Sequence, residues 1–159
     1  MGDMSALEPR VAALEDFYRQ VQRERMQGIP LLNPALHVQA VGFQWSHEDA
    51  QVAEGVLITP WFMSLVRLPA QVQAHEGRVG RKQVRDFGCE RFDFIGSWDA
   101  ALGYHETCAL FSPMGDFDSQ ERARDTARET LALLRAQAPA AEPMPARRAF
   151  FLGRGRAPQ

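Results

Sequence analysis

The sequence has few cysteines, and the two that it has are far apart. Cys89 and Cys108 are the only ones among 159 residues, and no Cys-x-x-Cys pair occurs. Four histidines are scattered along the chain: His37, His47, His75 and His105. No pair among these residues has the spacing typical of zinc ligands, although both thiols and two histidines could in principle meet in space. We expect two reduced, partly buried thiols, no metal and no cofactor.

Long hydrophobic runs and an excess of one charge are also missing. The net charge of −2 gives no reason to expect attraction to nucleic acid or to a membrane surface. No run reaches the ~18 consecutive apolar residues of a membrane-spanning helix. The first residues include Asp3 and Glu8 and no apolar segment, unlike a secretory signal. We expect a cytoplasmic protein without a nucleic-acid partner and without membrane insertion.

The chain lacks the sequence patterns of common catalytic sites. Ser64 and Ser112 do not lie in a Gly-x-Ser-x-Gly motif, and no glycine-rich phosphate loop follows a predicted strand. His105 lies three residues before Cys108 and could activate its thiol, so the alternative function is a thiol- or metal-handling enzyme that uses both residues. Residues three apart on a strand point to opposite faces, however. We therefore expect no catalytic residue and no enzyme activity.

What the chain has is the size and composition of one globular domain. The apolar fraction of 45% and the charged fraction of 24% are ordinary for such a domain, and ~150 residues can bury a real core. We expect a single domain over residues 1–137. Residues 138–159 form a linker rich in alanine and proline, followed by a basic tail.

The hydrophobic pattern predicts a helix, then several strands, then a second helix. Apolar residues recur at helical spacing in the first helix, and they are Leu7, Val11, Leu14, Tyr18 and Val21. A capping box at Asp118–Glu121 begins the second helix, which continues to about Ala136. Between the helices, a proline-rich connector over 29–36 is expected to be extended and packed. Strands are predicted over 37–45, 55–59, 63–68, 84–87, 92–96 and 104–111.

This order predicts an α+β fold. We expect a two-layer sandwich in which one antiparallel sheet is flanked by the N- and C-terminal helices, both on the same face. The other face of the sheet would then be left for a bound tail or for a partner.

The longest apolar run, over residues 55–69, contains the candidate binding surface. Its first part reads as a strand buried on both faces, which Pro60 ends because proline has no N–H to donate. Trp61, Phe62 and Met63 follow this break, and at least one of them should be partly exposed. An exposed aromatic and methionine surface is typical of peptide-binding sites. The alternative is an ordinary corner of the core.

Several segments of the chain resemble one protein family. The segments are Asn33-Pro34, Ile58–Met63, Leu68-Pro69, Leu102–Tyr104, Cys108–Met114 with Phe117, and Arg147-Arg148. In this order they are similar to the HybE/HupJ family of [NiFe]-hydrogenase assembly chaperones.

The resemblance implies a helper protein without catalytic activity. Its expected client is the precursor of the iron–sulfur small subunit with its twin-arginine signal, and the large subunit or another maturation chaperone are further partners to consider. The resemblance also implies the residues that bind the partner: Pro60, Trp61, Phe62, Met63, Phe111, Pro113 and Met114.

The basic tail suggests a second role. Arg147 and Arg148, followed by Phe150 and Leu152, resemble the Arg-Arg-x-Phe-Leu core of a twin-arginine signal. Our hypothesis is that this tail fills apolar pockets near Trp61 when no client is bound, either within one chain or by forming a homo-oligomer. The alternative is a basic end that only aids solubility.

Overall fold

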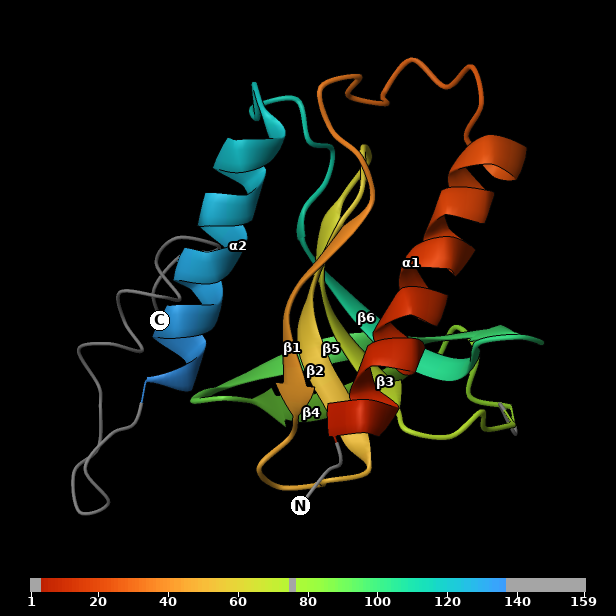
Figure 1. The fold of residues 1–159 in the computed structure, drawn as a ribbon, viewed down its shortest axis with the longest axis vertical. Coiled ribbons are helices and arrows are strands. Elements are labelled where there is room, and N and C mark those ends of the chain that lie inside the picture. Colours follow the sequence, from red (N-terminus) through yellow and green to blue (C-terminus); the bar gives the residue numbers. More distant parts are fainter. Residues whose placement is uncertain (1–3, 75–76, 137–159) are drawn as a thin grey trace.

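The computed structural model describes residues 4–74 and 77–136. It contains two helices and a six-stranded antiparallel sheet with the strand order β1-β2-β3-β6-β5-β4 (Figure 1). The elements are α1 (Met4–Arg25), β1 (Gln39–Trp45), β2 (Val52–Ile58), β3 (Met63–Pro69), β4 (Lys82–Phe87), β5 (Glu90–Asp99), β6 (Gly103–Phe111) and α2 (Gln120–Arg135). The predicted α+β class, with helices flanking an antiparallel sheet, is confirmed. The linker and basic tail lie outside the described residues.

The two helices cover opposite faces of the sheet, so the expectation that both lie on one face is wrong. Val56 and Ile58 of β2 belong to the core cluster under α2, whereas Ala53 and Leu57 of the same strand belong to the cluster under α1. Figure 1 shows the strands between the two helices. Side chains alternate along a strand, so a strand that is apolar at nearly every position needs a cover on each face. Where both helices are present, the molecule therefore has three layers.

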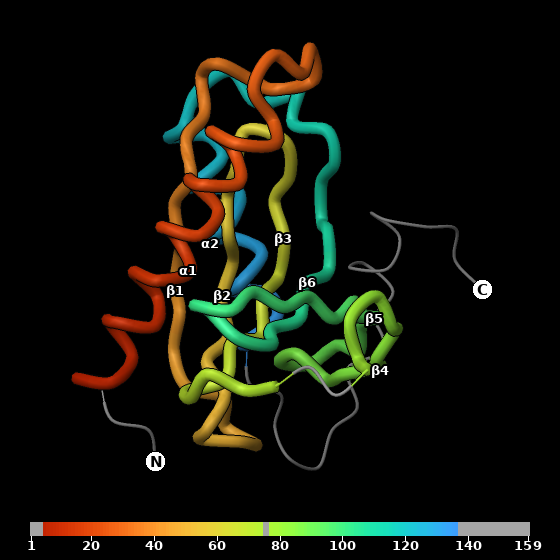
Figure 2. Tube along the Cα trace, turned by 90° about the vertical axis from the view of Figure 1, so that its right-hand side faces the viewer, coloured from red at the N-terminus to blue at the C-terminus, as the bar shows by residue number. Residues whose placement is uncertain are grey.

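The sheet changes direction at β6. The first half of this strand pairs with β5, and its second half, from Glu106 to Phe111, pairs with β3. In Figure 2, β4 and β5 cross the direction of β1, β2 and β3. The bend brings the β4–β5 turn to the C-terminal end of α2, where the N–H of Cys89 donates to the carbonyl of Leu134 at 2.7 Å.

Helix α2 begins as its sequence predicts. The Ser119 side chain accepts a hydrogen bond from the N–H of Arg122 at 3.1 Å, which satisfies one of the free donors of the first turn. The predicted apolar stripe is confirmed, because Ala123, Ala127 and Leu131 are buried in the core under this helix.

Among residues 4–74 and 77–136, no helix has the length and apolar character needed to cross a bilayer.

Candidate partner-binding surface

The β2–β3 hairpin closes through a turn built around Thr59. Its Oγ1 accepts hydrogen bonds from the N–H of Trp61 at 3.2 Å and of Phe62 at 3.0 Å, and its own N–H donates to the carbonyl of Phe62 at 2.8 Å. Strand β2 ends two residues before Pro60, which cannot donate to a strand ladder. The turn therefore holds the Trp61 and Phe62 backbone in a defined conformation.

Asn33 connects this turn to two other loops. Its N–H donates to the carbonyl of Pro60 at 3.0 Å. Its side-chain Nδ2 donates to the carbonyls of Met114 at 2.9 Å and Phe117 at 2.7 Å, while its Oδ1 accepts from the N–H of Ala35 at 2.9 Å. Three segments that are distant in sequence, 29–36, 59–62 and 111–117, thus meet at one end of the sheet. We call this region the loop end; it lies in the upper part of Figure 1.

The loop end exposes aromatic surface. Trp61 and Phe62 are half-buried, with ring centroids 5.8 Å apart, and Phe62 also approaches Tyr18 of α1 at 6.0 Å. Phe111 is 38% exposed and meets the ring of Phe117 edge-on at 5.2 Å. The prediction that at least one large apolar residue after Pro60 is partly exposed is therefore confirmed.

The seven residues expected to bind the partner fall into two groups. Trp61, Phe62, Phe111 and Pro113 have surface that a partner could contact. Pro60, Met63 and Met114 are buried, and both methionines belong to the core cluster under α2. The second group can shape the loop end but offers no exposed surface. The tail residues expected to occupy this region, Arg147, Arg148, Phe150 and Leu152, lie outside the described residues.

Sequence reasoning missed two features of the loop end. The first is Leu31, which is 64% exposed, and its neighbour Ile29 is 38% exposed. The connector was expected to pack, but it forms successive turns in which the N–H of Leu32 donates to the carbonyl of Ile29 at 3.2 Å. The second is the bridging role of Asn33, for which the available signal was the resemblance of Asn33-Pro34 to the family.

His105 and Cys108 lie on opposite faces of the sheet, as their spacing predicts. The imidazole of His105 is fully buried, donates from Nδ1 to the carbonyl of Gly103 at 3.2 Å, and accepts at Nε2 from the hydroxyl of Tyr18 at 3.0 Å. Cys108 packs instead against the core cluster under α2.

The environments of these two residues also disfavour thiol chemistry. Burial lowers the pKa of His105, while burial and, to a lesser extent, the carboxylate of Asp93 raise the pKa of Cys108. A thiol that resists ionisation is a poor nucleophile and a poor metal ligand. In the part of the chain that the structure describes, no three His, Cys, Asp or Glu side chains are placed to hold a metal ion.

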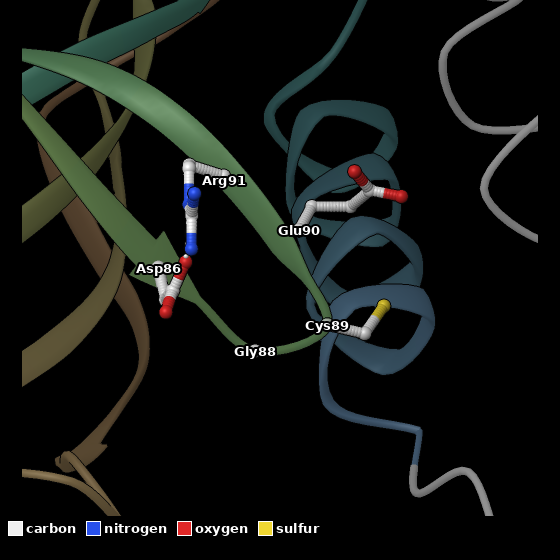
Figure 3. Close-up of a pocket in the computed structure, with 5 residues that line it drawn as sticks. All are labelled: Asp86, Gly88, Cys89, Glu90 and Arg91. Carbon is white, nitrogen blue, oxygen red and sulfur yellow. Dashed lines mark hydrogen bonds and ion pairs between the residues drawn. The ribbon is translucent and has the colours of Figure 1, made fainter. Parts of the chain in front are cut away.

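A cavity of about 370 Å³ lies at the β4–β5 turn, away from the expected binding residues. Figure 3 shows Asp86 and Arg91 on one side of this hairpin, where they form an ion pair at 2.9 Å, and Cys89 on the side facing α2. The Sγ of Cys89 lies 3.6 Å from the carbonyl of Leu133. Asp86 and Arg91 thus bind each other, Cys89 contacts the end of α2, and none of the expected site residues lines this cavity.

The protein is thus a small α+β protein that exposes aromatic side chains at the loop end. The family model for the [NiFe]-hydrogenase assembly chaperone HybE matches residues 9–153. Protein HoxT of Cupriavidus necator is 40% identical, over 92% of this chain and 90% of its own. The hydrogenase expression/formation protein HupT of Azotobacter chroococcum is 37% identical, over 87% of this chain and 91% of its own.

The fold has a counterpart among solved structures. The solution structure of HybE from Escherichia coli superimposes with a TM-score of 0.58 at 18% identity, over 85% of this chain and 86% of that one. The chain belongs to the HybE family of [NiFe]-hydrogenase assembly chaperones, as its sequence motifs suggest.

Proposed function

We propose that this protein is a cytoplasmic chaperone that binds the precursor of the iron–sulfur small subunit through its twin-arginine signal. It holds this precursor during hydrogenase maturation and catalyses no reaction itself. The observation that carries the proposal is the convergence of three of the family-like segments, Asn33-Pro34, Ile58–Met63 and Cys108–Met114, at the loop end. Asn33 joins them there, and Trp61, Phe62 and Phe111 remain accessible.

The geometry of the loop end suits the binding of an apolar segment. Aromatic side chains supply large contact areas and dominate the binding energy of many interfaces. The Thr59 turn fixes the backbone of Trp61 and Phe62 before binding, so that little ordering entropy is lost there. The exposed Leu31, two residues before Asn33, extends the apolar surface of this end.

The proposal is tested with separately expressed precursors of the small and large subunits. We expect the protein to retain the small-subunit precursor, and to lose it when the twin-arginine signal is removed. Retention of the large-subunit precursor alone would contradict the proposed client. Equal retention of the small subunit with and without its signal would contradict the proposed mode of recognition.

The binding surface is tested with a matched pair of tryptophan variants. Trp61→Ala should weaken binding of the small-subunit precursor by about 2 kcal/mol or more if it is an interface anchor. The control is Trp98→Ala, because Trp98 is 43% exposed but lies on β5, where it pairs with Tyr104 far along β6 from the loop end. A folded Trp61→Ala protein that binds as tightly as the control would show that Trp61 serves only the core.

A further inference from the structure

A second hollow lies between α1 and the edge strand β1. It has a volume of about 310 Å³, and its apolar walls are formed by Leu7 and Val11 of α1 and Phe43 of β1. Gly55 on β2 makes room for this wall, because a Cβ at that position would lie 2.4 Å from the Phe43 ring. We call this hollow the α1–β1 groove. Figure 2 shows the two elements side by side.

The α1–β1 groove combines apolar walls with negative charge. Glu8 and Glu15 line it, and no cation does so among the described residues. Glu15 accepts a hydrogen bond from the N–H of Ala40 at 2.7 Å and pairs with Arg19 on the same helix at 3.7 Å, so its carboxylate is held at the outer edge of β1 and its charge is partly compensated. Glu8 is exposed. Such a site suits a short segment that carries cations next to large apolar side chains.

The chain has such a segment, and the described part of the chain ends close to the groove. The guanidinium of Arg135, the last residue of α2, donates to the carbonyl of Gly42 in β1 at 2.7 Å. The sequence then continues to Arg147 and Arg148, which are followed by three large apolar residues, Phe150 to Leu152.

The length of the connection is sufficient. The path from Ala136 to Arg147 can extend to roughly 35–40 Å, and a proline-rich linker of this length spans about 34 Å. The segment has only to pass around the edge strand β1 to reach the other face of the sheet.

We propose that residues 147–152 of the same chain occupy the α1–β1 groove. Arg147 and Arg148 lie against the carboxylates of Glu8 and Glu15, while Phe150 and Leu152 contact the apolar walls. This occupant is the tail segment that the sequence suggests. The groove, however, is lined by the part of α1 from Leu7 to Glu15 and does not include Trp61. The docking does not depend on the identity of the client.

A modest intrinsic affinity is enough for high occupancy. A tether of this length gives an effective concentration of about 1 mM, so a segment with a local Kd of ~100 μM would fill the groove in about nine-tenths of the molecules. A tenfold weaker segment would fill it in about half. Because the arginines contribute through exposed ion pairs, occupancy should also fall as the salt concentration rises.

The test places a photo-crosslinking amino acid at Ala12, an exposed residue of α1 that lines the groove, in the full-length chain. The matched control is the same substitution at Ala6, which is exposed on the same helix but does not line the groove. Peptide mapping of the monomeric product should find residues 147–152 joined to position 12 and not to position 6. Equal crosslinking from both positions would refute specific docking. Products joining two chains would refute docking within one chain.

Charge exchange then tests the recognition itself. Arg147→Glu combined with Arg148→Glu should reduce the crosslink from position 12 about twofold, as the occupancies above require. Glu8→Arg alone should also reduce it, and combining Glu8→Arg with Arg147→Glu should restore part of the loss. These variants change exposed or terminal positions, and Glu15 is left unchanged because it bonds the β1 backbone. An unchanged crosslink in all charge variants would refute the assigned contacts.

Discussion

Replacing Asn33 by alanine should destabilise the protein by about 2 kcal/mol. The variant loses two hydrogen bonds from Nδ2, to the carbonyls of Met114 and Phe117, and one accepted by Oδ1 from Ala35. Each contributes a net ~0.5–1.5 kcal/mol, which gives a range of about 1.5–4.5 kcal/mol. Asn33 is only partly buried, so water can solvate some of the freed groups, and the lower half of this range applies.

The measurement is thermal unfolding followed by circular dichroism. For a protein of this size, about 2 kcal/mol corresponds to a fall in Tm of roughly 4–8 °C. The control is Gln27→Ala, an exposed position between α1 and the connector, which should change stability by no more than ~0.5 kcal/mol. An Asn33→Ala protein that unfolds together with this control would refute the bridging role.

A second substitution at the same position separates lost hydrogen bonds from lost volume. Asn33→Asp keeps the shape and the acceptor but turns a carboxylate oxygen toward the two carbonyls that Nδ2 now contacts. Repulsion should raise the pKa of this new carboxyl in the folded state. The folded state then binds more protons than the unfolded chain, so the defect should be largest at neutral pH and shrink as the pH falls. A defect that is independent of pH would contradict this account.

Four further predictions concern the framework. Cys108→Ala should lower the free energy of unfolding by about 1–2 kcal/mol and leave client binding intact. Loss of binding in the folded variant would support the alternative function that uses this thiol. Gly88→Ala should be strongly destabilising in denaturant titrations, because Gly88 has φ +62° and a Cβ there would lie 2.0 Å from a carbonyl of α2. The control is Gly115→Ala, which should be neutral because a Cβ at Gly115 would have no atom within 4 Å. Burial lowers the pKa of His105, so the unfolded chain takes up a proton that the folded state does not, and stability should fall as the pH drops below the unfolded value of ~6.5. Tyr18→Phe should lower the free energy of unfolding by about 1–3 kcal/mol in denaturant titrations, because it removes the hydrogen bond to His105. An unchanged free energy would mean that this bond contributes nothing to stability.

The elements with a clear hydrophobic period could be predicted from the sequence. The Ser119 cap and the alanine–leucine stripe of α2 depend on neighbours within one helix, and the strand over 63–68 lies between two prolines. The arrangement of layers could not be predicted in the same way. The run before Pro60 correctly indicated a strand buried on both faces, but periodicity does not say which helix covers which face.

Ion pairs between side chains on different strands could not be predicted from sequence patterns. Arg85 donates two hydrogen bonds to the buried carboxylate of Glu106 across strand β5, at 3.0 and 2.8 Å. Arg67 similarly pairs with Glu54 at 2.6 Å. Charged residues in a strand are read as solvent-exposed, and only the strand order and register show that these side chains neutralise one another.

The same limit explains why family-like motifs could not indicate which of their side chains are exposed at the loop end. Met63 and Met114 are buried, and the Asn33 side chain donates both amide hydrogen bonds to the carbonyls of Met114 and Phe117. These residues therefore fix the shape of the loop end. Leu31, at 64% exposure, can change with little cost to that framework, whereas the partly exposed Phe111 also packs against Phe117. A fold shared with Escherichia coli HybE at only 18% identity is compatible with this division. We therefore expect differences in client choice within the family to lie in such exposed positions, on a loop end of common geometry.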